Sequence, residues 1–142
     1  MTPSNQKGYR GYIFSRSIDG HRVPQHIQNL VIRDYATRRK LHYLLSATEY
    51  SMQGSYLILE QTLDDLAALD GIIVYTMFVL PAVAAQRRSI YKRVLAAGCS
   101  LHAAVEGFVL KDEGDIERWE NVLLTADICR DVNYQEIERW LT

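Results

Sequence analysis

Three side-chain amides stand at the start of a helix that the sequence predicts over Val23 to Lys40. They belong to Gln25, Gln28 and Asn29. Pro24 suits the first position of this helix, because the N–H that proline lacks would have no partner there. Amides both donate and accept hydrogen bonds, so this first turn can read the hydroxyl groups of a ligand. We therefore expect the functional site where this helix begins.

The polar loop before the helix offers charge and a titratable ring to the same place. Ser15, Arg16 and Ser17 can cradle an anion, with Arg16 or Arg22 as its charged partner beside the positive end of the helix. The alternative is a turn that only caps the helix region. His21 lies in this loop and is a candidate proton carrier.

Two glutamates are candidates for acid/base chemistry. Glu49, next to Tyr50, follows a short apolar run, and an enclosed carboxylate beside an aromatic ring would have its pKa moved into a useful range. The alternative for Glu49 is an exposed loop residue. Glu106 ends a later apolar run, and its position favours a site role to the same degree as a structural one.

Apolar runs of strand length alternate with helical patterns along the chain. Strands are expected at YRGYIFS from Tyr9, at Leu41 to Ala47, at Ile72 to Phe78 and at Ser100 to Val105, with Phe108 to Leu110 extending the last one or forming a short edge. Between them, helices are expected over Tyr56 to Leu69, with Leu59, Leu63 and Leu66 buried, and from Pro81 to about Ala97. Two further helices are expected from Asp112 and over Tyr134 to Leu141.

This alternation predicts a three-layer α/β domain with a mostly parallel sheet of four to five strands, doubly wound. Ligands of such sheets bind beyond the carboxyl ends of the strands. The polar groups at those ends are Ser15, Arg16 and Ser17; Ser46, Thr48, Glu49 and Tyr50; Tyr75 and Thr76; and Glu106. We expect Arg16, Gln28, Glu49 and Glu106 to border one shared cavity.

Length and composition favour one globular domain. The chain has 142 residues, which is enough for one core, with residues 1–10 frayed and residues 11–142 folded. The formal net charge of −1 provides no long-range attraction for a polyanion, so nucleic-acid binding would need a local patch. Two cysteines, no apolar leader and scattered histidines predict a cytoplasmic protein without a metal site, and no motif calls for a cofactor or a membrane.

Part of the sequence resembles the catalytic domain of serine recombinases of the resolvase type. The resemblance runs from about Gly11 to Glu106 and rests on GYIFSRS, on Gln25 or Gln28, and on RDYA, IIVYTMFVLP and AAGCSLHAAVE. It implies a resolvase-like fold. It also implies a site in which a serine of the first loop attacks DNA and arginines stabilise the charge of the phosphoryl transition state.

The sequence departs from this pattern at the reacting positions. If Arg16 takes the place of the serine, the arginine two positions earlier is replaced by Phe14; if Ser15 takes it, that arginine is replaced by Ile13. Apolar residues and Pro81 replace the arginine-rich segment after the third strand, and the C-terminal segment is acidic. We therefore expect the fold without recombinase chemistry.

A second resemblance covers nearly the whole chain. The segments PQHIQNLVIRDYA, LLSATEYSM, LDGIIVYTMFVLP and LHAAVE resemble the sporadic carbohydrate cluster family of small bacterial proteins. This resemblance implies a role beside genes for surface-polysaccharide sugars.

From these observations we expect a cofactor-independent enzyme of bacterial surface-carbohydrate synthesis. Glu49, His21 or Glu106 would move protons on a phosphorylated or nucleotide-activated sugar, as in an isomerase or epimerase. Ser15 is the fourth candidate catalytic residue. The expected partner is this anionic sugar, without nucleic acid or membrane, and with a possible second copy of the chain. The alternative is a recombinase-derived scaffold or regulatory binding module without catalysis.

Overall fold

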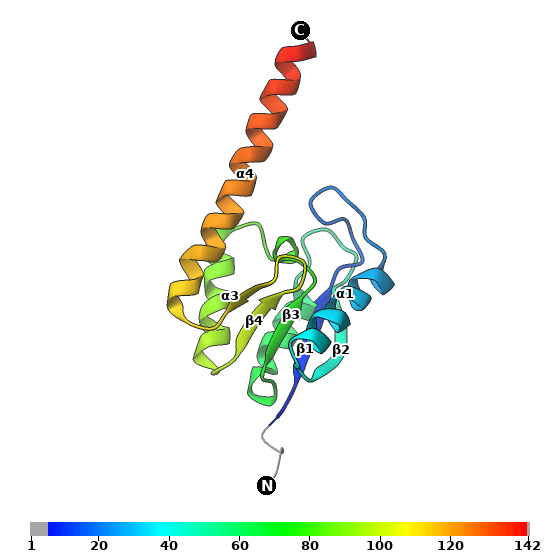
Figure 1. The fold of residues 1–142 in the computed structure, drawn as a ribbon, viewed down its shortest axis with the longest axis vertical. Coiled ribbons are helices and arrows are strands. Elements are labelled where there is room, and N and C mark those ends of the chain that lie inside the picture. Colours follow the sequence, from blue (N-terminus) through cyan, green and yellow to red (C-terminus); the bar gives the residue numbers. More distant parts are fainter. Residues whose placement is uncertain (1–5, 142) are drawn as a thin grey trace.

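A five-stranded sheet forms the centre of the computed structural model, which describes residues 6–141 and the side chains of residues 6–129 (Figure 1). Its strands are β1 (Tyr9–Ile13), β2 (Tyr43–Thr48), β3 (Gly71–Val74), β4 (Ser100–Ala103) and β5 (Phe108–Leu110). They lie in the order β2-β1-β3-β4-β5. The first four are parallel, and β5 pairs antiparallel with β4 as a short edge strand.

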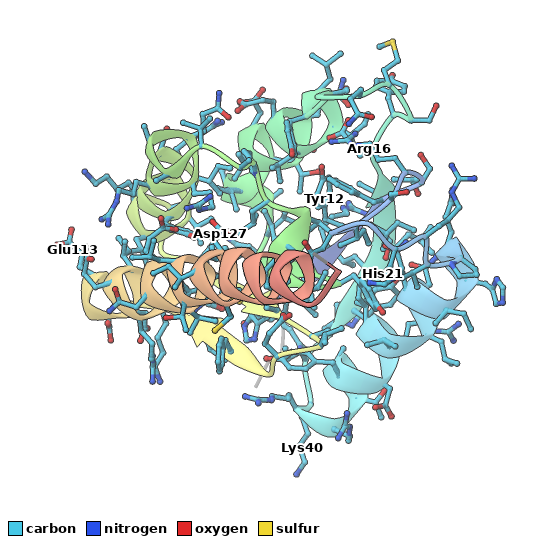
Figure 2. All side chains as sticks on the ribbon, turned by 90° about the horizontal axis from the view of Figure 1, so that it is seen from above. Tyr12, Arg16, His21, Lys40, Glu113 and Asp127 are labelled. Atoms are coloured by element: carbon cyan, nitrogen blue, oxygen red, sulfur yellow. The ribbon has the colours of Figure 1, made fainter. Side chains whose placement is uncertain are left out.

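Helices cover both faces of this sheet. The helices are α1 (Gln25–Arg38), α2 (Leu57–Asp64), α3 (Ala84–Ala96) and α4 (Glu113–Leu141), with 3₁₀ turns η2 (Leu66–Ala68) and η3 (Met77–Val79). Helix α1 lies on one face, and α2 and α3 lie on the other, with α4 packed against α3 and β5 (Figures 1 and 2). The predicted three-layer, mostly parallel, doubly wound α/β class is confirmed.

The larger core lies between the sheet and the helices α2, α3 and α4. Leu59, Leu63 and Leu66 are 2–4% exposed, so the buried stripe predicted for this segment is confirmed. Trp119 of α4 packs edge-on against Tyr91 of α3, with ring centroids 5.9 Å apart, and both side chains are fully buried. Burying each large apolar side chain contributes about 1.5–3 kcal/mol, so this side anchors the base of α4.

The opposite core, under α1, is smaller and differs from the predicted stripe. The helical spacing of Ile27, Leu30, Val31 and Tyr35 in the sequence predicts that this stripe faces the core. In the structure, however, Leu30 is 63% exposed and Ile27 is 37% exposed. The residues that face the sheet are Gln28, Ile32, Tyr35 and Ala36. They keep helical spacing, so the helix is rotated about its axis by roughly one residue relative to the prediction. Gln28 explains the rotation, because its side chain must point into the domain to form hydrogen bonds with the backbone of Phe14 and Val23.

A chain of polar contacts runs across the α1 face of β4. The Tyr35 hydroxyl is 2.7 Å from His102 Nδ1, His102 Nε2 is 2.9 Å from Ser100 Oγ, and Ser100 Oγ is 3.4 Å from the Tyr9 hydroxyl. His102 is 5% exposed, and burial, reinforced by the charge of Arg39, lowers its pKa to about 4. This histidine is therefore a neutral, hydrogen-bonded core residue at neutral pH.

Strands β3 and β4 approach each other too closely for any side chain at Gly71. A Cβ atom built there would clash with the carbonyl oxygen of Ser100 on β4 and with the ring of Tyr9. Glycine is thus required by the packing at the start of the central strand. Strand β3 is buried along its whole length and ends at Val74, earlier than the predicted end at Phe78, because the chain turns into η3.

The C-terminal region forms one helix where the sequence analysis expected two. Helix α4 is continuous from Glu113 to Leu141, because no proline interrupts it and its one glycine, Gly114, lies in the first turn. It extends beyond the body of the domain on the side of the strand ends (Figure 1). At the other terminus, β1 begins at Tyr9, inside the segment expected to be frayed, and residues 1–5 lie outside the described residues. Among the described helices, none is long and apolar enough to cross a membrane.

Candidate functional site

The loop after β1 is fastened to α1 by Gln28. Its Oε1 accepts a hydrogen bond from the Phe14 amide at 3.0 Å, and its Nε2 donates to the carbonyl oxygens of Phe14 at 2.8 Å and Val23 at 2.9 Å. The side chain has no exposed surface. Gln28 therefore holds the β1–α1 loop in place, and its amide is used within the fold rather than turned toward a ligand.

Glu49 is a buried carboxylate that caps α2. Its Oε1 accepts hydrogen bonds from the Tyr12 hydroxyl at 2.7 Å and the Leu59 amide at 3.1 Å. Its Oε2 accepts three more, from the amides of Tyr50 and Ile58 at 3.1 Å and from the Ser55 hydroxyl at 3.3 Å. The side chain is 1% exposed, so it is not the exposed loop residue that was the alternative. It satisfies the free amides at the start of α2, which is the role of an N-terminal cap.

The electrostatics of Glu49 oppose the predicted acid/base role. Burial raises the pKa of this carboxyl, but the hydrogen bonds from Tyr12 and from backbone amides outweigh burial and hold the pKa below its ordinary value. The shift that we predicted, toward a value suited to proton transfer, is thus wrong in direction. At neutral pH Glu49 is an ionised acceptor, and burial together with the hydrogen bond to Glu49 raises the pKa of Tyr12.

Arg16 and Ser15 join the β1–α1 loop to the loop that follows β2. The Arg16 guanidinium lies over the rings of Phe14 and Tyr56, 4.1 Å and 5.1 Å from their centroids. Its Nη1 donates to the carbonyl oxygens of Tyr50 at 2.9 Å and Met52 at 3.3 Å. The Ser15 hydroxyl donates to the carbonyl oxygen of Glu49 at 3.1 Å. These contacts make Arg16 a clamp between two loops.

Glu106 performs a similar task at the end of β3. It accepts hydrogen bonds from the Thr76 hydroxyl at 2.5 Å and from the Met77 amide at 3.0 Å, at the start of η3. It also borders a hollow of about 400 Å³ with Tyr35, Arg38 and Arg39. Tyr75, at the end of the same strand, is half-buried and packs between the two cores.

The remaining candidates lie in two other places. Asn29 and Ser46 border a groove between α1 and β2, where the Tyr43 hydroxyl is 2.7 Å from Ser46 Oγ and 3.5 Å from Asn29 Oδ1. The others are exposed at the end of β2, in the strand-end loops and in the first turn of α1: Ser17, His21, Arg22, Gln25, Thr48 and Tyr50. Figure 2 shows Arg16 and His21 well apart across this end of the sheet.

The structure therefore does not bring Arg16, Gln28, Glu49 and Glu106 into one cavity. Gln28 and Glu49 are buried, and Glu106 borders a hollow beside α1. The strand ends do converge, since Ser15, Arg16, Glu49 and Tyr50 are in contact, but they meet through hydrogen bonds with one another. These hydrogen bonds join the loops to each other at that position.

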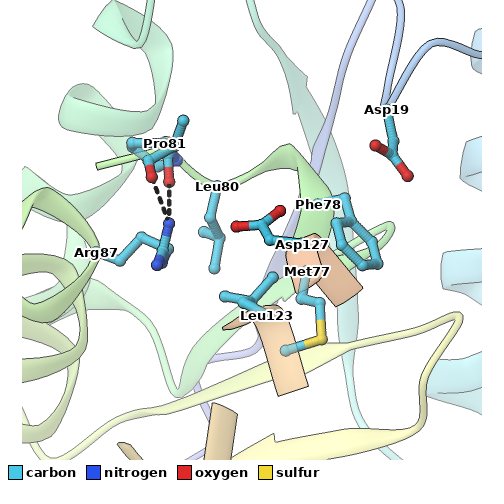
Figure 3. A pocket seen from close by; sticks show the side chains of 9 residues that line it. Asp19, Met77, Phe78, Leu80, Pro81, Arg87, Leu123 and Asp127 are labelled. Carbon is cyan, nitrogen blue, oxygen red and sulfur yellow. Dashed lines mark hydrogen bonds between the residues drawn. The ribbon is translucent and has the colours of Figure 1, made fainter. Parts of the chain in front are cut away.

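A cavity that the sequence analysis missed lies nearby, between the β1–α1 loop, the β3–α3 loop and α4 (Figure 3). Its volume is about 180 Å³, and its walls include Asp19, Phe78 and Asp127. Arg87 donates through Nη1 to the carbonyl oxygens of Pro81 and Ala82 at 3.0 and 2.8 Å. The loop positions could have been found from the strand ends, but the contribution of α4 requires the tertiary fold. In the described part of the chain, no cluster of His, Cys, Asp and Glu could hold a metal ion.

The strand order and the long helix after the edge strand define a resolvase-like α/β fold. The structure is similar to that of a resolvase family site-specific recombinase from Streptococcus pneumoniae, with a TM-score of 0.62 and 14% identity over 90% of this chain and 94% of that chain. It is also similar to the N-terminal catalytic domain of TP901-1 integrase, with a TM-score of 0.58 and 14% identity over 87% and 98% of the two chains. No family model matches the sequence, and no curated protein matches it.

These similarities correct the functional reading of the sequence. The expected sugar-modifying enzyme and its anionic sugar partner are wrong, because the proteins that share the fold are a recombinase and an integrase catalytic domain. The exclusion of nucleic acid as a partner is wrong for the same reason. The resemblance to the sporadic carbohydrate cluster family has no support from the comparisons, whereas the resolvase-like fold is confirmed.

Proposed function

We propose that this chain is a recombinase-fold binding module that holds nucleic acid without cutting it. The observation that carries the proposal is that the loops at the carboxyl ends of β1 and β2 are joined to one another by hydrogen bonds. Arg16 clamps the carbonyl oxygens of the β2–α2 loop, and Glu49 caps α2. Ser15 donates its hydroxyl to a backbone oxygen. A serine nucleophile needs a base or free cationic groups beside it, and this arrangement supports a role without that chemistry.

Nucleic acid is the partner class that the fold supports best. The two similar structures are a site-specific recombinase and an integrase, and both names describe action on DNA. The free cysteines, buried Cys99 and exposed Cys129, are consistent with a reducing compartment such as the cytoplasm. A cytoplasmic location is part of the proposal.

Two assays on the full chain test this function together. The first measures retention of labelled duplex DNA on a filter at low salt, and we expect retention that falls as salt rises. The second incubates the protein with supercoiled plasmid and resolves the products on a denaturing gel. We expect neither nicked plasmid nor a covalent protein–DNA adduct.

Each assay has an outcome that overturns its half of the proposal. Absence of retention at low salt would exclude the binding function. An adduct that disappears in Ser15→Ala or Ser17→Ala would show that the protein cuts DNA through that serine. Nicking that persists in both variants without an adduct would indicate a contaminating nuclease, and repeated purification would then remove it.

A further inference from the structure

Charge is divided unequally between the two parts of the sequence. Residues 1–50 contain eight Lys or Arg and three Asp or Glu, whereas residues 51–142 contain eight and fourteen. The formal net charge of −1 therefore conceals a basic first part and an acidic second part. A local basic surface is what a protein of low net charge needs for binding a polyanion.

The three arginines of α3 are neutralised by ion pairs with α2 and α4. Arg87 binds Glu120 of α4 through two hydrogen bonds of 2.8 Å, and Tyr91 donates to the same carboxylate. Arg88 pairs with Glu117 at 2.7 Å. Arg93 pairs with Glu60 and Asp64 of α2 at 2.7 and 2.8 Å. These cations hold α2, α3 and α4 together and offer little free positive charge.

The cations of α1 are arranged differently. We define the α1 cationic surface as Arg33, Arg38, Arg39 and Lys40, which are all exposed. Among the described residues, their one ion pair is Arg38 with Asp34 at 2.8 Å, and both side chains of that pair are more than half exposed. An exposed pair of this kind contributes at most about 1 kcal/mol, so Arg38 can exchange Asp34 for another anion.

The shape around α1 exposes these cations on both sides of the helix. Arg33 borders a groove of about 530 Å³ between α1 and β2, and Arg38 and Arg39 border the hollow of about 400 Å³ beside the β4–β5 turn. The Arg39 guanidinium lies 4.8 Å from the Tyr35 ring centroid and donates to the Gly107 carbonyl oxygen at 3.3 Å. Figure 2 shows Lys40, just past the end of α1, pointing away from the domain, and Glu113 at a different edge of the molecule, where α4 begins.

We infer that the α1 cationic surface binds the phosphate backbone of double-stranded DNA, an inference that rests on the proposed function. Arg33 and Arg38 are five residues apart on α1, about 7.5 Å along the helix, which is close to the axial rise of about two phosphates of one strand. The acidic second part of the chain repels the polyanion, so α1 is turned toward DNA and α4 away from it.

Stabilisation of the helix end does not by itself explain this surface. Cations in the last turn interact favourably with the helix dipole, by about 0.3–1 kcal/mol each, and Arg38 to Lys40 benefit from this effect. Arg33 lies more than one turn earlier, where the dipole effect has decayed. The scarcity of acidic residues in the first part of the sequence is likewise unrelated to the helix end.

Two variants with the same change in net charge test the inference. Arg33→Glu/Lys40→Glu reverses two exposed cations of the α1 cationic surface. Lys92→Glu/Lys111→Glu reverses two exposed cations elsewhere on the molecule, at the α3 and α4 groove. The measurement is fluorescence anisotropy of a labelled random-sequence duplex over a series of salt concentrations, with thermal unfolding of each variant as a check of folding.

We expect the α1 variant to bind roughly tenfold to a hundredfold more weakly at 0.1 M salt, and its salt slope to fall by about 2, while the control keeps most of the wild-type affinity. Equal losses of affinity in both variants, or no loss in the α1 variant, would show that DNA does not bind at the α1 cationic surface. The proposed binding of nucleic acid would then be unaffected. Absence of wild-type binding would overturn the function itself. If the reversal variant unfolds, Arg33→Gln/Lys40→Gln replaces it.

A membrane is the competing polyanionic surface. The same proteins are therefore mixed with vesicles that contain phosphatidylserine and are sedimented. Vesicle binding by the wild type at the salt concentration of the DNA assay would overturn the assignment to DNA if two conditions hold. The affinity for vesicles must exceed the affinity for duplex DNA, and the α1 variant must no longer sediment with the vesicles. We expect the protein to stay in the supernatant.

Discussion

Glu49→Gln tests whether the strand-end carboxylate is a structural cap. Glu49 accepts five hydrogen bonds, of which three come from backbone amides. The hydroxyls of Tyr12 and Ser55 can rotate and accept from the new amide group, but a backbone N–H cannot. In either orientation of the glutamine, at least one buried backbone N–H therefore loses its acceptor.

The magnitude follows from these contacts. A buried unsatisfied donor costs about 1–3 kcal/mol, and the charge lost at the helix start costs about 0.3–1 kcal/mol more. We expect Glu49→Gln to lower the free energy of unfolding by roughly 2–4 kcal/mol in urea titrations. The matched control is Glu60→Gln on the same helix, whose exposed pair with Arg93 contributes at most about 1 kcal/mol. A loss for Glu49→Gln no larger than that of the control would refute the capping role.

The same carboxylate gives a dependence on pH with a defined sign. Because the folded-state pKa of Glu49 is below the ordinary 4.5, its stabilisation is fully present above that value and is lost as pH falls through the folded-state pKa. The free energy of unfolding should therefore fall less steeply below pH 4.5 in Glu49→Gln than in the wild type. An identical acid dependence in both proteins would contradict the pKa shift.

Three further predictions test the cores. His102 has a folded-state pKa of about 4, so between about pH 6.5 and 4 the unfolded chain binds the proton more readily than the folded protein. This difference destabilises the folded protein as pH falls, and His102→Gln should remove up to roughly 3 kcal/mol of that destabilisation. Urea titration at several pH values measures the effect. Ile32→Ala should cost about 2–5 kcal/mol and Leu30→Ala under about 0.5, and a reversed order in thermal unfolding would support the stripe predicted from sequence. Gly71→Ala should destabilise by about 1–3 kcal/mol because its Cβ meets the Ser100 carbonyl, and an unchanged melting temperature would contradict this packing.

The fold class could be predicted because it depends on the order of elements. Alternating strands and helices specify a parallel sheet, and the apolar stripe along α2 and η2 is regular enough to identify Leu59, Leu63 and Leu66. The rotation of α1 could not be predicted, because Gln28 is polar and its burial depends on backbone groups of Phe14 and Val23. Local hydropathy contains no information on those partners.

The candidate site shows the same limit. Several of the polar residues predicted at strand ends do meet, such as Ser15, Arg16, Glu49 and Tyr50, whereas Ser46 and Thr48 lie within β2. Their partners decide whether they face a ligand or one another, and those partners lie far away in sequence, as Tyr12 and Leu59 do from Glu49. The basic surface of α1 was overlooked because the whole-chain charge averages two unequal parts.

Helix α4 has a mechanical consequence. Its base is held by Trp119 and by the Arg87–Glu120 pair, and its last buried described side chain is Leu123. The remaining backbone to Leu141 continues as helix for about 27 Å. A lever of this length turns a rotation of about 5° at the base into a displacement of about 2 Å at the tip. Loosening the Arg87–Glu120 pair would therefore redirect the far end without any change in the sheet.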